Sequence, residues 1–118
     1  MCGISGELRL DNQPASATTI ARMLTQLARR GPDDQGAWQQ GPVAFGHRRL
    51  SSIDFSAQSH QPMHDGSLSL VFNGAIYNYR ELRAELQGKG HTFTTAGDTE
   101  VILKAYQEWG TAVSYTHL

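Results

Sequence analysis

The spacing of hydrophobic residues changes several times along the chain, and each change predicts a new element. Over residues 3–10, apolar or small residues alternate with polar ones, which is the period of a half-buried strand. Over residues 20–28 the apolar positions fall on one helical face, and Gly31-Pro32 ends that helix. Residues 37–39 and 43–47 are expected to form the two strands of a hairpin around a Gln-Gly-Pro turn.

Two further helices are predicted in the second half. The first starts at Asn78, which together with Glu81 resembles a capping box, and it ends at the Gly-Lys-Gly of residues 88–90. The second is capped by Asp98 and closed by Gly110. Their apolar faces are Leu82 and Leu86 in the first helix, and Val101, Ile102, Ala105 and Trp109 in the second.

The remaining segments fix the fold class. Residues 54–66 are polar and rich in turn formers, so a loop is expected there, while 68–72 and, more weakly, 91–95 have the pattern of strands. Residues 111–118 match no pattern. Strands and helices mix without a regular βαβ rhythm, which favours an α+β fold with a largely antiparallel sheet.

Composition narrows the class of protein. The chain has 118 residues, the usual size of one domain, and its 10 basic and 11 acidic residues give a net charge of -1. That balance lacks the basic excess of a nucleic-acid or membrane-surface binder. No apolar run is long enough to span a membrane, the N-terminus has no secretory signal, and the single cysteine fits a reducing compartment. We therefore expect a cytoplasmic globular protein.

Cys2 is the first candidate for chemistry. A lone cysteine is most often a small buried hydrophobe. If Met1 is removed, however, Cys2 carries both a thiol and a free α-amino group, and such an amine titrates close enough to neutrality to act as a base. One residue then supplies nucleophile and base together, the N-terminal form of an activated nucleophile. Position alone leaves both interpretations open.

Asn73-Gly74 is the candidate oxyanion site. Asn-Gly is also the strongest short signal for a hairpin turn, which is the plainer interpretation. The residues that follow, 75–78, lead toward a helix instead of a returning strand. A side-chain amide and a glycine N–H at a strand end are the donors that a tetrahedral intermediate needs.

Arg48, Arg49 and Asp98 are candidate substrate ligands. Two arginines after an apolar strand are usually a solvated face, but a guanidinium can also grip a substrate carboxylate through paired hydrogen bonds. Asp98 is a helix cap by default and could also hold an ammonium group.

A zinc site is the remaining chemical alternative, because His47, His60 and His64 accompany Cys2. Pro62 lies between the last two histidines and argues against one helix face presenting both. No second cysteine supports such a site, so no metal is expected.

Six segments, in order, resemble the class II glutamine amidotransferase domain, the N-terminal-nucleophile type found in asparagine synthetases. The resemblance covers residues 1 to about 110. The segments are Met1-Cys2-Gly3-Ile4, Arg30-Gly31-Pro32-Asp33, His47-Arg48-Arg49-Leu50-Ser51, Gln61-Pro62-Met63, Phe72-Asn73-Gly74-Ala75-Ile76-Tyr77-Asn78 and Gly97-Asp98-Thr99-Glu100-Val101.

The resemblance implies a role for each candidate residue. Cys2 would attack the side-chain amide of glutamine, release ammonia and leave a γ-glutamyl thioester for water to hydrolyse. Asn73 and Gly74 would form the oxyanion hole, Arg49 would bind the α-carboxylate of glutamine, and Asp98 would bind its α-ammonium. The implied fold is the αββα four-layer sandwich of the N-terminal-nucleophile hydrolases, incomplete in this chain.

It also implies partners. The ammonia would pass to a C-terminal synthetase domain that uses ATP and magnesium, whereas this domain itself needs no cofactor. No SGGxDS-like motif is present, so no synthetase activity is expected of these residues. The amidotransferase domain is assigned to residues 1–110, truncated, and 111–118 do not match. Because the next strands of the family are missing, isolated 1–118 is expected to form homo-oligomers or to be poorly soluble, with weak glutaminase turnover.

One departure points to a branch of the family. Many asparagine synthetases carry Glu where this chain has Ala75, and the surrounding motif looks closer to the N-acetylglutaminylglutamine amide synthases. Two rival functions stay open: a catalytically inactive fragment or binding module of the same fold, and the glutaminase domain of a class II amidotransferase serving sugar or purine synthesis.

Overall fold

The computed structural model describes residues 1–50 and 59–118 and confirms the mixed α+β class. The chain divides into two compact units. Among the described residues, unit 1 comprises 1–50 and 60–73, and unit 2 comprises 59 and 74–118.

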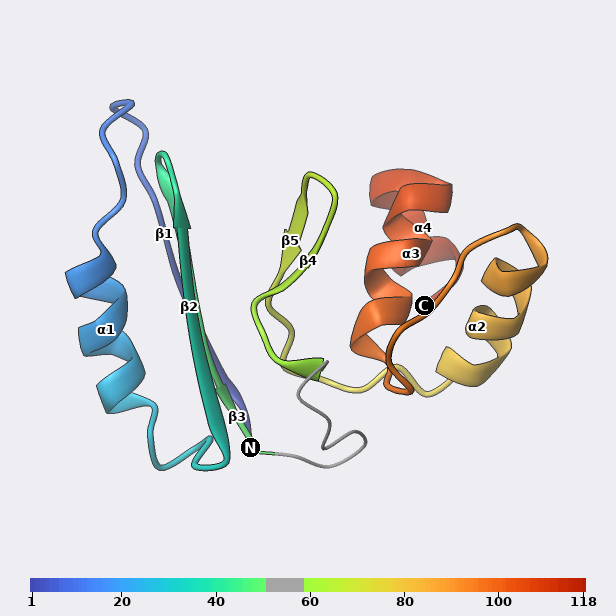
Figure 1. Ribbon diagram of the computed structural model, residues 1–118, viewed down its shortest axis with the longest axis horizontal. Coiled ribbons are helices and arrows are strands. Elements are labelled where there is room, and N and C mark those ends of the chain that lie inside the picture. The colour runs from blue at the N-terminus through green and yellow to red at the C-terminus, as the bar shows by residue number, and fades with distance from the viewer. Residues whose placement is uncertain (51–58) are drawn as a thin grey trace. The chain divides into compact units, whose positions relative to one another are not determined.

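Unit 1 is built on a three-stranded antiparallel sheet in the order β1-β3-β2. Helix α1 lies on one side of this sheet, and a two-stranded hairpin lies on the other (Figure 1). The elements are β1 (Gly3–Leu8), α1 (Ala17–Gln26), β2 (Asp34–Gln40), β3 (Val43–Arg49), β4 (Met63–Asp65) and β5 (Leu68–Leu70).

Small residues let α1 approach the sheet closely. A Cβ on Gly46 of β3 would lie 2.9 Å from Ile20 and 3.0 Å from Leu24, both buried on the inner face of α1. Ala44, two residues earlier on the same strand face, is fully buried with them. Ser16 caps the helix by accepting a hydrogen bond from the Thr19 N–H at 3.1 Å.

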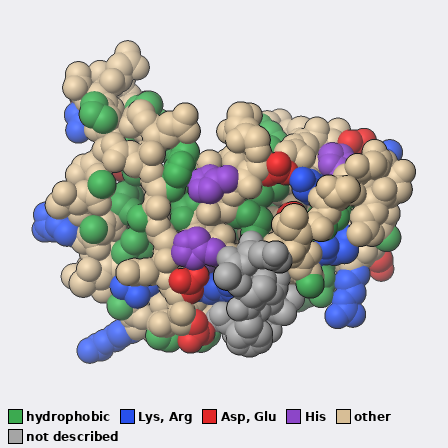
Figure 2. Space-filling view, viewed as in Figure 1, with side chains coloured by type: hydrophobic (Ala, Val, Ile, Leu, Met, Phe, Trp, Pro, Cys, Tyr) green, Lys and Arg blue, Asp and Glu red, His purple; other side chains and the backbone are tan. Residues whose placement is uncertain are grey.

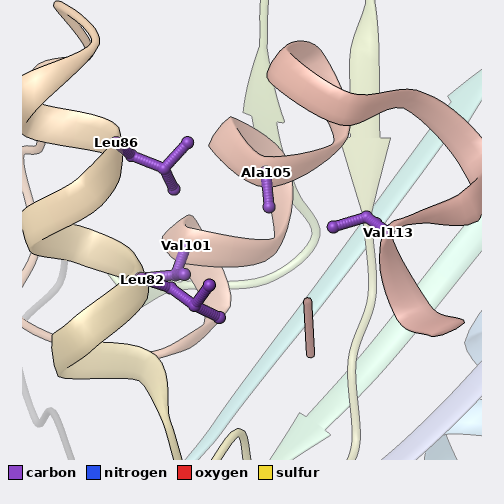
Figure 3. Close-up of a cluster of buried hydrophobic side chains, with 5 residues drawn as sticks. All are labelled: Leu82, Leu86, Val101, Ala105 and Val113. Carbon is purple, nitrogen blue, oxygen red and sulfur yellow. The ribbon is translucent and has the colours of Figure 1, made fainter. Parts of the chain in front are cut away.

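Unit 2 is helical in its described residues. Helix α2 (Tyr79–Gly88) packs against α3 (Thr99–Trp109), which is followed by the 3-10 turn η2 (Gly110–Ala112) and the short α4 (Val113–Thr116). Figure 3 shows its core, to which all three α-helices contribute. The buried side chains are Leu82, Leu86, Val101, Ala105 and Val113.

Several predicted elements are confirmed. The alternation at the N-terminus forms β1, although the strand ends at Leu8 and not at residue 10. The helix predicted from the apolar positions of residues 20–28 is α1, and the predicted hairpin is formed by β2 and β3. The two later helices are α2 and α3. Gly110 closes α3 with a φ of 75°, a conformation that favours glycine.

Three predictions of local structure are wrong. Part of the expected loop, Met63–Asp65, is strand β4, while residues 54–58 of that loop lie outside the described residues. The segment 91–95 is not a strand. The Asn78 and Asp98 side chains occupy N-cap positions but make no capping hydrogen bond. The Asn78 amide donates instead to the His117 carbonyl at 2.7 Å.

The surface carries charges of both signs. On the face drawn in Figure 2, basic and acidic side chains are both scattered, and no field of one sign stands out. No helix among the described residues is long and apolar enough to cross a membrane.

Candidate active site

The sheet register places Cys2 at the end of β3. Because Gly3 pairs with Arg48 in the antiparallel ladder, the start of β1 lies beside the last residues of β3. The Cys2 thiol accepts a hydrogen bond from the Leu50 N–H at 3.3 Å and contacts the Leu50 carbonyl at 3.5 Å. The side chain is a free thiol of intermediate burial, so the interpretation as a fully buried hydrophobe is wrong.

Asn73 contacts the nucleophile candidate directly. Its side-chain Nδ2 donates a hydrogen bond to the Cys2 carbonyl at 3.0 Å, although 71 residues separate the two in the chain. The amide nitrogen carries two hydrogens, so a bond to the Cys2 carbonyl orients a second N–H on the same atom. No strand follows Asn73 among residues 74–118, so the hairpin-turn interpretation is wrong.

The two arginines of β3 have different surroundings. Arg48 faces α1, where its Nε donates to the Leu24 carbonyl at 3.0 Å. Arg49 points to the opposite face by the alternation of the strand and is only 9% exposed. A solvated face therefore does not describe Arg49, which ends its strand one residue before the Leu50 amide that contacts the thiol.

The segment after α1 packs against the same end of β3, although its sequence predicts no chemical role for it. The backbone of Arg48 lies so close to Gly31 that a Cβ there would overlap it. The Asp33 N–H donates to the Arg49 carbonyl at 2.9 Å, and Arg30 Nε donates to the Cys2 carbonyl at 3.3 Å. The sequence predicts that Gly31-Pro32 ends a helix and includes the pair in a family segment, and the structure adds that such close backbone contact requires a glycine at position 31.

Unit 2 carries Gly74 and Asp98. The Asp98 side chain is 6% exposed, and its carboxylate accepts a hydrogen bond from the Ile76 N–H at 2.9 Å. This contact ties the start of α3 to the segment that follows Gly74 and replaces the expected helix cap.

Two long side chains hold the loop that precedes Asp98. The buried Glu100 carboxylate accepts hydrogen bonds from the backbone N–H groups of Thr94 and Thr95, at 3.0 and 2.8 Å, and from both hydroxyls. Arg83 donates to the carbonyls of Thr95 and Gly97 at 2.8 and 2.7 Å. The sequence predicts no role for either side chain, because that role depends on which backbone groups the fold brings to them.

The three histidines of the zinc alternative have separate partners. His47 contacts the Phe72 carbonyl at 3.2 Å, His60 the Asp34 carboxylate at 2.6 Å, and His64 the Ser69 hydroxyl at 2.8 Å. Within residues 1–50 and 59–118, no group of three or more metal-ligating side chains comes together.

Comparison with known sequences identifies the class. The profile of the glutamine amidotransferase domain matches residues 1–117. Asparagine synthetase [glutamine-hydrolyzing] 3 of Bacillus subtilis is 40% identical over 114 residues, which cover 92% of this chain and 18% of the relative. Asparagine synthetase 1 of the same organism is 41% identical over 116 residues, covering 92% and 18%. Asparagine synthetase 1 of Arabidopsis thaliana is 39% identical over 113 residues, covering 93% and 19%.

These matches define an amidotransferase domain of the asparagine synthetase type. The chain belongs to the glutamine amidotransferase domain family and corresponds to the glutaminase half of its asparagine synthetase relatives. It spans less than a fifth of the length of those three relatives. The predicted class is confirmed, whereas the roles of individual residues stay predictions.

Proposed function

We propose that Cys2 hydrolyses the side-chain amide of glutamine. With Met1 removed, the α-amine of Cys2 takes the thiol proton, and the sulfur attacks the amide carbon. The collapsing tetrahedral intermediate expels the amide nitrogen, which leaves as ammonia with the proton from the amine. Water then attacks the γ-glutamyl thioester, which yields glutamate and restores the thiol.

The observation that carries this proposal is the hydrogen bond from Asn73 Nδ2 to the Cys2 carbonyl. It holds an amide donor beside the nucleophile, where negative charge develops on the substrate oxygen. Asn73 and the Gly74 N–H would stabilise that oxyanion, an interaction for which removal of one donor costs about 100- to 1000-fold in kcat.

Arg49 and Asp98 are proposed to recognise the amino-acid end of glutamine. A guanidinium forms paired hydrogen bonds with an α-carboxylate, and a carboxylate attracts an α-ammonium. Burial of both side chains supports this assignment, because partly desolvated charges act more strongly on a ligand than solvated ones.

The ammonia is proposed to serve a synthetase domain outside these residues. That domain is proposed to use ATP and magnesium, as the resemblance to the asparagine synthetase family implies. We propose that residues 1–110 form the core of the amidotransferase domain, as an incomplete αββα sandwich in a cytoplasmic protein, and the family profile extends through residue 117. The antiparallel sheet with a helix on one side supports this fold.

A second candidate concerns the ammonia acceptor. Ala75 stands where many asparagine synthetases carry a carboxylate, and the surrounding motif resembles that of the N-acetylglutaminylglutamine amide synthases, so a dipeptide-like acceptor is proposed in place of free aspartate. Supplying each acceptor with glutamine and ATP to the full protein that carries this sequence, and measuring amide formation, decides between them.

Replacement of the nucleophile tests the primary proposal. Intact-mass analysis should show a mature protein that begins at Cys2, and Cys2→Ala should abolish glutamine hydrolysis in the full protein. Cys2→Ser should be nearly as damaging, because a hydroxyl is a poorer nucleophile with the same base. Hydrolysis by Cys2→Ala at the wild-type rate would show that Cys2 is not the nucleophile, whereas no hydrolysis by the wild type would favour the inactive-module alternative.

A further inference from the structure

We infer that His47 and Gln61 are positioning residues that fix Asn73 beside the nucleophile. Each contacts one backbone polar group of Phe72, and we call this pair of contacts the Phe72 grip. The inference rests on the proposed glutaminase function, in which Asn73 supplies an oxyanion donor. Neither side chain is proposed to touch the substrate.

Both backbone polar groups of Phe72 are bound by side chains. Its N–H donates to Gln61 Oε1 at 2.7 Å, and its carbonyl lies 3.2 Å from His47 Nε2. Strand β5 has already ended at Leu70, so no ladder holds Phe72 in the way that β3 is held. The side chains of Gln61 and His47 therefore bind the Phe72 N–H and carbonyl, which a neighbouring strand would bind in a sheet.

The two side chains that contact Phe72, those of His47 and Gln61, are both buried. His47 is 1% exposed and Gln61 is 7% exposed. A carbonyl oxygen only accepts, so His47 Nε2 must carry the hydrogen of this bond. Burial lowers the pKa of His47 from its ordinary value of 6.5, which favours the neutral ring. A neutral imidazole with its hydrogen on Nε2 matches this geometry.

Gly36 explains how Gln61 reaches this position. Gly36 of β2 pairs with His47 of β3, so the two residues are neighbours on the sheet. The Gln61 carbonyl occupies the space where a Cβ of Gly36 would stand. The absence of a side chain at Gly36 thus lets the 60–62 segment lie on the sheet next to His47, from where the Gln61 amide reaches Phe72.

The position of Phe72 determines the position of the next residue, Asn73, which contacts the nucleophile candidate. Phe72 precedes Asn73, whose Nδ2 donates to the Cys2 carbonyl at 3.0 Å. All of these contacts lie within unit 1. Misplacement of a catalytic group by about 1 Å costs on the order of 100-fold in rate, so loosening Phe72 should weaken oxyanion stabilisation without changing the substrate ligands.

Gln61→Met in the full protein that carries this sequence tests the grip, because it keeps the side-chain length and removes the acceptor. We expect kcat for glutamine hydrolysis to fall about 10- to 100-fold while KM changes less than about twofold. Gln39→Met is the control, since it removes a glutamine bond to the Ala15 carbonyl from strand β2, away from Phe72. An equal loss in both variants, or a rise in KM alone, would overturn the inference.

A double-mutant cycle separates positioning from general stability. If His47 and Gln61 act through Asn73, Gln61→Met should cost less than about twofold further in an Asn73→Ala background. Additive losses would overturn the inference. His47→Gln, which keeps an N–H donor, should retain more kcat than His47→Met, and this comparison applies even if Gln61→Met does not fold.

Amide hydrogen exchange provides a readout independent of activity. The Phe72 N–H should exchange at least about tenfold faster in Gln61→Met than in the wild type. If the wild type shows no Cys2-dependent hydrolysis, the proposed function fails, while the exchange rates still decide whether the grip exists. Equal Phe72 exchange in both proteins would overturn the grip even if hydrolysis is observed.

Discussion

At the scale of the residue, Arg49 differs from its neighbour although both are arginines on one strand. Arg49 is buried, whereas Arg48 donates to a carbonyl of α1. A buried guanidinium is a planar fork that matches a carboxylate, whereas a lysine ammonium is a compact point charge. This difference makes a conservative substitution informative.

Arg49→Lys should raise KM for glutamine by about 10- to 100-fold, because the fork on the α-carboxylate is lost while the charge remains. Ammonia-dependent amide synthesis by the full protein should persist. Steady-state kinetics with glutamine and with ammonia check this. If both activities fell together, Arg49 would be a structural residue.

His47 gives the stability of the protein a predictable pH dependence. Burial is the largest cause of its lowered pKa, and the nearby Arg49 adds to it, while the bond to the Phe72 carbonyl opposes it. The unfolded chain therefore takes up a proton near pH 6.5 that the folded chain resists. The free energy of unfolding should decrease as the pH falls from 7.5 through 6.5 toward 5. Urea titrations across this range should show a shallower slope for His47→Gln, and an unchanged slope would contradict the assignment.

Sequence reasoning found the residues with unusual chemistry at unusual positions. Cys2 was identifiable because it follows Met1, and Asn73 because an Asn-Gly pair precedes a helix instead of a strand. Gln61, Arg30 and Glu100 were not assigned roles. Each of these side chains forms a hydrogen bond with a backbone group of a residue that the fold brings near. The sequence around a polar side chain does not reveal which backbone group it will bind.

At the scale of the element, periodicity predicted β1, α1 and the β2–β3 hairpin because each has one face on a core. The prediction of a strand at 91–95 failed for a specific reason. The backbone N–H groups of Thr94 and Thr95 bond to the Glu100 carboxylate instead of to another strand. A buried side chain can satisfy the same donors as a ladder, and the alternating pattern does not distinguish the two.

Removal of the Glu100 carboxylate should therefore unfold this loop. Glu100→Ala leaves the buried Thr95 N–H and the part-buried Thr94 N–H without their acceptor, which should cost about 3 kcal/mol in the free energy of unfolding. Glu100→Gln keeps one acceptor oxygen and should cost about half as much. Glu85→Ala on the exposed side of α2 is the control and should change stability by less than about 0.5 kcal/mol. Urea denaturation measures all three, and equal effects of Glu100→Ala and Glu85→Ala would contradict this role.

At the scale of the whole molecule, unit 1 leaves part of its sheet uncovered. Ile4 and Leu8 lie on the face of β1 away from α1, and they are 48% and 64% exposed. Figure 2 shows hydrophobic side chains at the surface of this unit. Among the described residues β1 is also an edge strand, with β3 on one side only. An apolar face next to an open edge favours pairing with another chain.

We therefore expect a polypeptide of residues 1–118 alone to associate as its concentration rises. Size-exclusion chromatography with light scattering over a dilution series measures this. Leu8→Lys places a charge on the exposed face of the edge strand and should shift the distribution toward monomer. Leu10→Lys removes an equally apolar but more exposed side chain beyond the end of the strand, so it should have a smaller effect. A monodisperse monomer at all concentrations, or equal effects of the two substitutions, would mean that the β1 edge does not drive association.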